Sequence, residues 1–345
     1  MRIRGVVEGF YGPPWTHAER LDLLAFCGRE GLTTWVHAPK HDPWHRRLWR
    51  EPYPEPELER LAELVATAAR GGVDFAYALA PGLSICYSDE ADFETLLAKL
   101  EQLRGIGVRR FHLLFDDIEQ ELNCAQDEQR YGHEARPSAA AQADLSNRVL
   151  RALPQAGPLV VCPRGYAGTE RTDYRELFGR QLEPDVVVYW TGPEVVSPAI
   201  TRADLDAAAG GFGHELLLWD NYPVNDFAPE TLFLGPLTGR DPDLAGGRCA
   251  GLIANAMLQA VPSKLALATV ADWARDPRAY DPLAAYGRAL AAHGAEVVEA
   301  LRALAPGASV GTTQSPPPAD AAGLVEALAL GVDAATGVAL LEPFA

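Results

Sequence analysis

The chain has 345 residues, of which 48% are hydrophobic, so it can bury the core of one large α/β domain with a short addition. Asp and Glu number 47 against 30 Lys and Arg, and the formal net charge of -17 would repel a nucleic-acid backbone over most of the surface. No apolar run is long enough to span a membrane, and no secretory signal precedes the first strand-like segment. We therefore expect no nucleic-acid partner and no membrane partner.

Short apolar runs that are rich in Val, Ile, Leu and aromatic residues predict eight strands, at 5–10, 33–38, 75–80, 111–115, 159–162, 186–190, 215–219 and 251–255. Segments with helical spacing predict helices at 16–30, 55–70, 91–105, 138–153, 202–209 and 262–273. Thr16 and Glu19 form a capping-box pattern at the start of the first helix. The helices after the fifth and seventh strands are less clear.

Alternation of strands and helices predicts an α/β fold, a (β/α)8 TIM barrel over residues 1–278, because right-handed crossovers join parallel strands. An open doubly wound sheet is the alternative, but no GxGxxG or Walker-type loop follows the first strand. Residues 279–345 read as a C-terminal helical appendage, with helices at about 282–304 and 324–330 around a Pro-rich stretch. It either packs on the barrel or mediates a homo-oligomer contact, and the sequence does not separate the two.

The cysteine count is odd and the residues are widely spaced, with no CxxC pair and no metal-ligand spacing. They are Cys27, Cys86, Cys124, Cys162 and Cys249. This pattern predicts reduced thiols and a cytoplasmic location.

Active-site residues of TIM barrels lie where strands end and the following loops begin. The candidate residues at these positions are Glu8, Gly9, Lys40, Asp116, Asp117, Tyr166, Trp190, Thr191, Asp220, Asn221, Asp226 and Asn255. Among them, Asp116 and Asp117 end a buried strand, where burial and mutual repulsion would raise one pKa and hold the other down. Such a pair suits acid catalysis of glycoside cleavage, although it also suits a helix cap or a metal site.

Several motifs resemble those of glycoside hydrolase family 84, the O-GlcNAcases and bacterial β-N-acetylglucosaminidases. They are GVVEGFYGPPW at 5–15, APK at 38–40, LLFDDI at 113–118, WDN at 219–221 and ND at 225–226. The similarity runs from about residue 4 to about residue 276. It implies a retaining exo-β-N-acetylglucosaminidase whose partner is a glycoconjugate ending in N-acetylglucosamine, with no cofactor.

The resemblance also implies substrate-assisted catalysis through an oxazoline. Asp116 would orient and stabilise the 2-acetamido group, and Asp117 would be the general acid and base. The residues implied to bind the sugar or to line its acetamido pocket are Gly9, Lys40, Tyr166, Thr191, Trp219, Asn221, Asp226 and Asn255. Read without the resemblance, each of these fits an ordinary role in a cap, a turn, the surface or the core.

Two alternatives of other classes remain: a catalytically silent glycan-binding barrel, and a metal-dependent deacetylase or other hydrolase. The metal alternative rests on His37, His41, Asp42 and His45, which show neither HxH nor HExxH spacing, so we expect no metal. His41 follows Lys40 where many members of the family carry an acid. The sequence does not say whether the natural substrate is protein O-GlcNAc, a cell-wall fragment or a chitin-type oligomer.

Overall fold

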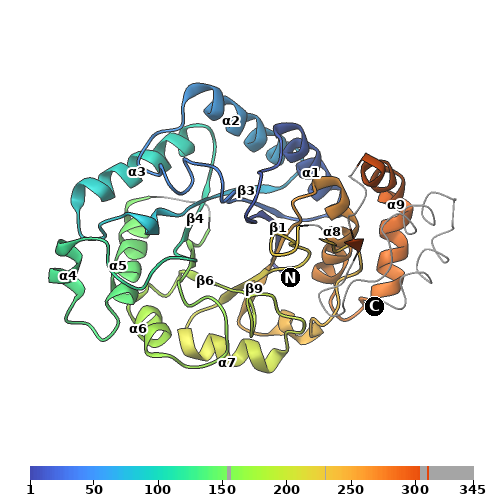
Figure 1. Cartoon of the computed structure of the whole chain (residues 1–345). Helices are drawn as coiled ribbons and strands as arrows, with labels where there is room; N and C mark the ends of the chain where they lie inside the picture. Colours follow the sequence, from blue (N-terminus) through green and yellow to red (C-terminus); the bar gives the residue numbers. More distant parts are fainter. Residues whose placement is uncertain (154–156, 230, 304–308, 311–345) are drawn as a thin grey trace.

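The computed structural model describes residues 1–153, 157–229, 231–303 and 309–310. Parallel strands close a barrel in the order β1-β2-β3-β4-β5-β6-β7-β9 (Figure 1). They are β1 (Ile3–Glu8), β2 (Thr34–His37), β3 (Asp74–Leu79), β4 (Arg110–Leu114), β5 (Val160–Cys162), β6 (Val187–Trp190), β7 (Leu216–Asp220) and β9 (Cys249–Asn255). The predicted TIM barrel is confirmed, and every predicted strand overlaps one of these strands.

Helices surround the barrel (Figure 1). They are α1 (His17–Glu30), α2 (Glu55–Arg70), α3 (Glu90–Gly105), α4 (Ala125–Tyr131), α5 (Pro137–Ala152), α6 (Asp173–Gln181), α7 (Arg202–Phe212) and α8 (Ala260–Arg275). The predicted capping box begins α1, where the Thr16 hydroxyl accepts from the Glu19 amide and the Glu19 carboxylate accepts from the Thr16 amide. Within the described ranges, no helix has both the length and the apolar character to cross a bilayer.

The helices that the sequence left unclear have different outcomes. A helix does follow β5, namely α6, and Thr172 caps its start through the Arg175 amide. The described part of the connection after β7 holds instead the short strand β8 (Thr231–Leu232) and the 3-10 helix η2 (Pro242–Gly246). The sequence prediction missed α4, which is only 7 residues long.

Side chains that alternate along the strands divide the core into two layers. On β1, for example, Val7 packs inside the barrel with Val36 of β2, whereas Val6 packs outside among the helices with Trp35. All strands run in the same direction, so their carboxyl ends meet at one rim, and Glu8 at the end of β1 pairs in register with His37 at the end of β2. Residues that follow different strands in sequence therefore face a common space.

The C-terminal helix α9 (Pro282–Ala303) packs against α8 on the outside of the barrel (Figure 1). Buried Lys264 of α8 binds Asp22 of α1 and Glu296 of α9, each at 2.7 Å. Helix α9 matches the helix predicted at 282–304. It packs on the barrel, which is one of the two roles that the sequence left open for the C-terminal appendage. The predicted helix at 324–330 lies outside the described residues, and the boundary at 278 and the homo-oligomer contact stay predictions.

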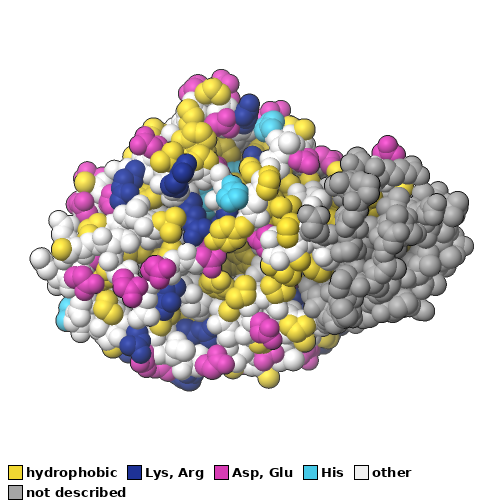
Figure 2. All heavy atoms as spheres, viewed as in Figure 1, with side chains coloured by type: hydrophobic (Ala, Val, Ile, Leu, Met, Phe, Trp, Pro, Cys, Tyr) yellow, Lys and Arg dark blue, Asp and Glu magenta, His cyan; other side chains and the backbone are white. Residues whose placement is uncertain are grey.

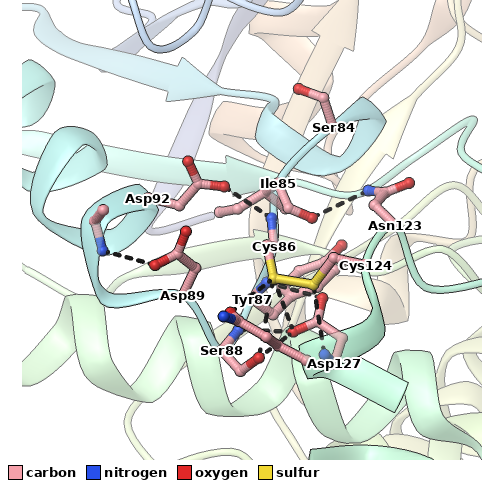
Figure 3. Close-up of a disulfide and its surroundings, with 12 residues drawn as sticks. Ser84, Ile85, Cys86, Tyr87, Ser88, Asp89, Asp92, Asn123, Cys124 and Asp127 are labelled. Carbon is pink, nitrogen blue, oxygen red and sulfur yellow. Dashed lines mark hydrogen bonds between the residues drawn. A yellow bond between two sulfur atoms is a disulfide. The ribbon is translucent and has the colours of Figure 1, made fainter. Parts of the chain in front are cut away.

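A disulfide joins Cys86, in the segment that leads to α3, to Cys124, the N-cap of α4 (Figure 3). The prediction of reduced thiols is therefore wrong for this pair, because the fold brings together two cysteines separated by 38 positions. The thiols of Cys27, Cys162 and Cys249 are free. The cytoplasmic location stays a prediction, without the support that wholly reduced cysteines would have lent it.

Hydrogen bonds reinforce the disulfide on both sides (Figure 3). The buried carboxylate of Asp127 accepts from the backbone amides of Tyr87 and Ser88, at 2.9 and 2.7 Å. The side-chain amide of Asn123 donates to the carbonyl of Ile85 at 3.1 Å. The loop that follows β4 is thus fastened to the loop that follows β3.

Candidate active site

A cavity of about 250 Å³ opens at the rim where the strands end. Its lining residues are Gly9, Tyr11, Lys40, Asp116, Asp117, Cys162, Tyr166, Thr191, Val195, Val196, Trp219, Asn221, Val224, Asp226, Phe227 and Asn255. Figure 2 shows a hollow near the centre of one face, with hydrophobic, basic and acidic side chains around it. All the site residues expected from the sequence are in this lining, although they come from the strands β7 and β9 and from the loops after β1, β2, β4, β5, β6 and β7.

Lys40 and Asp116 form an ion pair in the wall of the cavity. Their side chains are only 2% and 11% exposed. Burial raises the pKa of the Asp116 carboxyl, but the charges of Lys40 and Arg46 and the hydrogen bond from Lys40 outweigh it, so the pKa lies below its usual range. Asp116 is therefore a carboxylate at neutral pH, and its charge is set by Lys40 rather than by repulsion from its neighbour.

One carboxylate oxygen of Asp116 takes no part in the ion pair with Lys40. Oδ2 accepts from Lys40, whereas Oδ1 is buried and has no hydrogen-bond partner among the described residues. A buried carboxylate oxygen without a donor is costly, and a ligand N–H placed there would remove the cost.

Asp117 lies in a different environment, exposed at the mouth of the cavity. The Tyr11 hydroxyl donates to Oδ2 at 2.8 Å, and the Tyr166 hydroxyl donates to Oδ1 at 2.9 Å. Burial is the main reason that the pKa of each tyrosine is raised, so both hydroxyls keep their protons. The two adjacent carboxylates thus differ: Asp116 is buried and held charged, while Asp117 is open to solvent and held between two hydroxyl donors.

A hydrogen-bonded group of amides forms another part of the wall. Asn221 Oδ1 accepts from Trp219 Nε1 and from Asn255 Nδ2, each at 3.0 Å, and Asn221 Nδ2 donates to the Val195 carbonyl at 2.7 Å. The Gly9 amide donates to Asn255 Oδ1 at 3.2 Å. Gly9 must lack a side chain, because a Cβ there would lie 2.3 Å from Trp219 Cζ2. These contacts fix the rings and amides before any ligand binds.

The remaining expected residues have partners of their own. Asp226 Oδ2 accepts from the Tyr11 amide at 2.7 Å. The Thr191 hydroxyl donates to the Glu194 carbonyl at 3.0 Å. Both residues still contribute surface to the cavity.

The sequence analysis missed six lining residues, and most of them are apolar: Tyr11, Cys162, Val195, Val196, Val224 and Phe227. Phe227, Val195 and Tyr11 are among the exposed large hydrophobic residues of the chain, at 57%, 48% and 39%. Tyr11 lies in a motif that the sequence analysis had used, but nothing local to that motif indicates that its hydroxyl binds Asp117. It also missed Arg46, which donates to the Tyr11 hydroxyl at 2.7 Å and to the Asp117 carbonyl at 3.0 Å.

Other polar residues at strand ends point elsewhere. Glu8 binds Arg20 and accepts from the Trp15 amide, and Asp220 forms a buried, bidentate ion pair with Arg240 at 2.7 Å. These buried pairs link the barrel to surrounding segments and leave both carboxylates outside the cavity lining. A strand-end position is thus a useful indication of a site residue but not sufficient.

His37, at the end of β2, and His41, Asp42 and His45, in the loop after it, do not come together as a group of metal ligands. His45 Nδ1 binds the Ala78 carbonyl, His37 Nε2 lies 3.8 Å from Asp42, and Asp42 accepts from the Tyr53 hydroxyl. Within the described part of the chain, the only group of metal-ligand type is Cys86, Cys124 and Asp127. Because its two sulfur atoms are bonded to each other, that group is a disulfide with a neighbouring carboxylate.

The sequence profile of the family described as beta-N-acetylglucosaminidase matches residues 4–306. The chain belongs to glycoside hydrolase family 84. It is 35% identical over 275 residues to the Protein O-GlcNAcases of Rattus norvegicus and Mus musculus, covering 78% of this chain and 29% of each relative. The chain thus spans less than a third of the length of these relatives.

The solved structure of a mutant O-GlcNAc hydrolase from Thermobaculum terrenum is similar in fold, with a TM-score of 0.81 at 35% identity. The match covers 86% of this chain and 65% of that one. The family is described as beta-N-acetylglucosaminidase, and the matched residues 4–306 include all the barrel strands apart from Ile3 and all the residues that line the cavity.

Proposed function

We propose that the chain is a retaining exo-β-N-acetylglucosaminidase of the O-GlcNAcase type, which removes terminal N-acetylglucosamine by substrate-assisted catalysis. The observation that carries this proposal is the contrast between the two adjacent carboxylates. Asp116 is buried, charged and has one oxygen without a donor, whereas Asp117 is exposed at the mouth of the same cavity. One group suits the stabilisation of a positive charge, and the other suits proton exchange with a leaving group and with water.

In the first step, the acetamido oxygen of the substrate attacks C1 as the bond to the leaving oxygen breaks, which gives an oxazoline ring in its protonated, oxazolinium form. Asp116 Oδ1 accepts the acetamido N–H, and the carboxylate stabilises the positive charge that spreads onto the ring. Asp117 gives its proton to the departing oxygen. In the second step, Asp117 takes a proton from water as the water attacks C1, and the acetamido group is restored with retention of configuration.

The lining of the cavity supports the recognition of an uncharged sugar by oriented hydrogen bonds and an apolar wall. We assign the sugar hydroxyls to Lys40, Asp226, Asn255 and the Gly9 backbone. The acetamido pocket is assigned to Trp219, Asn221 and Thr191, with Tyr166 on the oxazoline side. Asn221 has one amide hydrogen left after its bond to Val195, which suits it to contact a carbonyl oxygen.

The names of the rat and mouse relatives make protein-bound O-GlcNAc the first substrate to test. Purified protein should be assayed with aryl N-acetylglucosaminides, aryl N-acetylgalactosaminides, chitin-type oligomers and an O-GlcNAc glycopeptide. The highest kcat/KM among the natural linkages would identify the glycoconjugate class. Absence of turnover of every N-acetylglucosaminide would instead favour a glycan-binding barrel without catalysis.

The division of labour between the carboxylates has its own test. Asp117→Ala should spare aryl glycosides with activated leaving groups in the first step and cripple those whose leaving oxygen needs a proton, with loss of the basic limb of the pH profile. Asp116→Ala should slow all substrates by a more uniform factor of about 10²-fold or more, because its charge acts on the developing oxazolinium. The same dependence on leaving-group pKa in both variants would show that the assigned roles are wrong.

A further inference from the structure

Arg46 is linked to Asp117 by two routes, one direct and one through Tyr11. Its Nη2 donates to the Asp117 carbonyl oxygen at 3.0 Å. Its Nη1 donates to the Tyr11 hydroxyl at 2.7 Å, and that hydroxyl donates to Asp117 Oδ2 at 2.8 Å. The arginine therefore holds the backbone of Asp117 directly and its carboxylate through one tyrosine.

The direction of these hydrogen bonds follows from the chemistry of the groups. A guanidinium can only donate, so the Tyr11 oxygen must accept from Arg46. The single hydroxyl hydrogen of Tyr11 then remains for Asp117 Oδ2, and the guanidinium also lies over the Tyr11 ring, 5.6 Å from its centroid. Arg46 thus determines both the place of the tyrosine and the direction in which its hydroxyl points.

The backbone of Asp117 needs such support. Its φ is 51°, and among the described residues it is the only non-glycine residue with positive φ. A strained conformation of this kind persists where surrounding contacts hold it. The hydrogen bond from Arg46 to the Asp117 carbonyl is one such contact. Arg46 lies in the loop that follows β2, whereas Asp117 lies in the loop that follows β4.

We propose that Arg46 is a positioning residue for the acid/base carboxylate: through the Asp117 carbonyl and the Tyr11 hydroxyl it aims Asp117 at the leaving-group oxygen. This inference rests on the proposed acid/base role of Asp117. Arg46 acts through another residue, so its removal affects the proton-transfer part of the reaction more than the binding of the sugar. A surface arginine that merely stabilised the loop would affect all substrates alike.

The test measures kcat/KM for aryl N-acetyl-β-glucosaminides that range from nitrophenyl to phenyl leaving groups. Arg46→Met, which removes the donors and keeps an unbranched stem, should leave the most activated substrate within about twofold of the native protein and lower kcat/KM for the phenyl substrate by about 10- to 100-fold. Arg46→Lys should recover part of the loss, since one ammonium cannot make both bonds. Tyr11→Phe removes the hydroxyl that joins Arg46 to the Asp117 carboxylate, so it should show the same trend.

Arg47→Met is the matched control, because Arg47 is exposed and makes no hydrogen bond or ion pair with the described residues. It should follow the native protein across the whole series. Turnover of the activated substrate shows in the same preparation that each variant is folded. A uniform loss in Arg46→Met, or none at all, would overturn the inference.

Asp117→Ala in the same series separates this inference from the proposed function. Where Asp117→Ala is sensitive to the leaving group and Arg46→Met is not, the positioning role alone fails. Where Asp117→Ala is itself insensitive, the acid/base role fails and the positioning role fails with it. Adding Arg46→Met to Asp117→Ala should cause no further leaving-group dependence, and a further dependence would count against the inference.

Discussion

Lys40 binds one oxygen of the buried Asp116 carboxylate, and the other oxygen of that carboxylate has no partner among the described residues. Lys40 affects both the charge of Asp116 and the choice of the carboxylate oxygen that stays free. The ammonium keeps Asp116 charged in a wall where burial alone would favour the neutral acid. By binding Oδ2, it also leaves Oδ1 as the oxygen available to an acetamido N–H.

Lys40→Met should therefore move the acid limb of the pH profile of kcat/KM to higher pH. Burial raises the pKa of Asp116, and without Lys40 only weaker opposing influences remain, such as the charge of Arg46. A carboxyl group with a higher pKa is protonated up to a higher pH, so the variant loses activity at pH values where the native protein is still active. At neutral pH we expect kcat/KM to fall by about tenfold or more.

Asp226→Asn is the matched control for this variant, because Asp226 is also assigned to the sugar hydroxyls, but it accepts from the Tyr11 amide and does not hydrogen-bond to Asp116. It should raise KM and leave the acid limb where it is in the native protein. An unshifted acid limb in Lys40→Met would contradict the electrostatic role of Lys40.

The acetamido group of the substrate should be obligatory, because it supplies the nucleophile as well as a binding contact. An aryl glucoside should not be turned over, and a stable thiazoline analogue should bind about 10²-fold or more tightly than N-acetylglucosamine. Competition assays against an aryl N-acetylglucosaminide measure the inhibition constants of the thiazoline and of N-acetylglucosamine. Equal affinity of the two inhibitors would exclude an oxazoline-like intermediate, and Asp116→Asn should abolish most of the difference between them.

Exhaustive treatment with EDTA should leave kcat and KM unchanged. The reaction as proposed calls for no Lewis acid, since the substrate provides the nucleophile and Asp117 provides the proton. A zinc hydrolase treated in the same buffer serves as the positive control for chelation. Loss of turnover that a divalent ion restores would favour the metal-dependent alternative.

The disulfide between Cys86 and Cys124 should stabilise the fold, because it restricts the unfolded chain between two residues that are 38 positions apart. The double variant with Cys86→Ser and Cys124→Ser should lose about 2 to 4 kcal/mol of the free energy of unfolding, measured by urea denaturation under non-reducing conditions. A dithiol reductant should lower the stability of the native protein and leave that of the double variant unchanged. Equal stability of the native protein and the double variant would show that the bond does not contribute.

The barrel and most of the site could be predicted from the sequence because they depend on local patterns. Apolar runs of strand length, separated by helical spacing, specify parallel strands, and parallel strands place their following residues at one rim. This is why residues as distant in sequence as Lys40 and Asn255 were assigned to one site and lie in one cavity. Glu8 and Asp220 are also at strand ends and lie in the same motifs, but the resemblance implied no role for them at the sugar, and both form structural ion pairs.

The features that were missed depend on how loops approach each other. Arg46 reaches Tyr11 from a loop after a different strand, and no periodicity relates two such positions. The pairing of Cys86 with Cys124 depends likewise on two loop conformations, and cysteine spacing alone does not determine which thiols meet. Side-chain hydrogen bonds between loops therefore needed the three-dimensional structure.

The positive φ of Asp117 has a consequence for protein engineering. Glycine adopts this backbone geometry without strain, so Asp117→Gly should relieve roughly 1 kcal/mol at that position while removing the proposed proton donor. A mutant library selected only for thermal stability would tend to accumulate Asp117→Gly and to yield proteins that are more stable but no longer turn over substrate. Engineering of this protein for thermal stability should therefore leave position 117 unchanged, or select for stability and for enzymatic activity together.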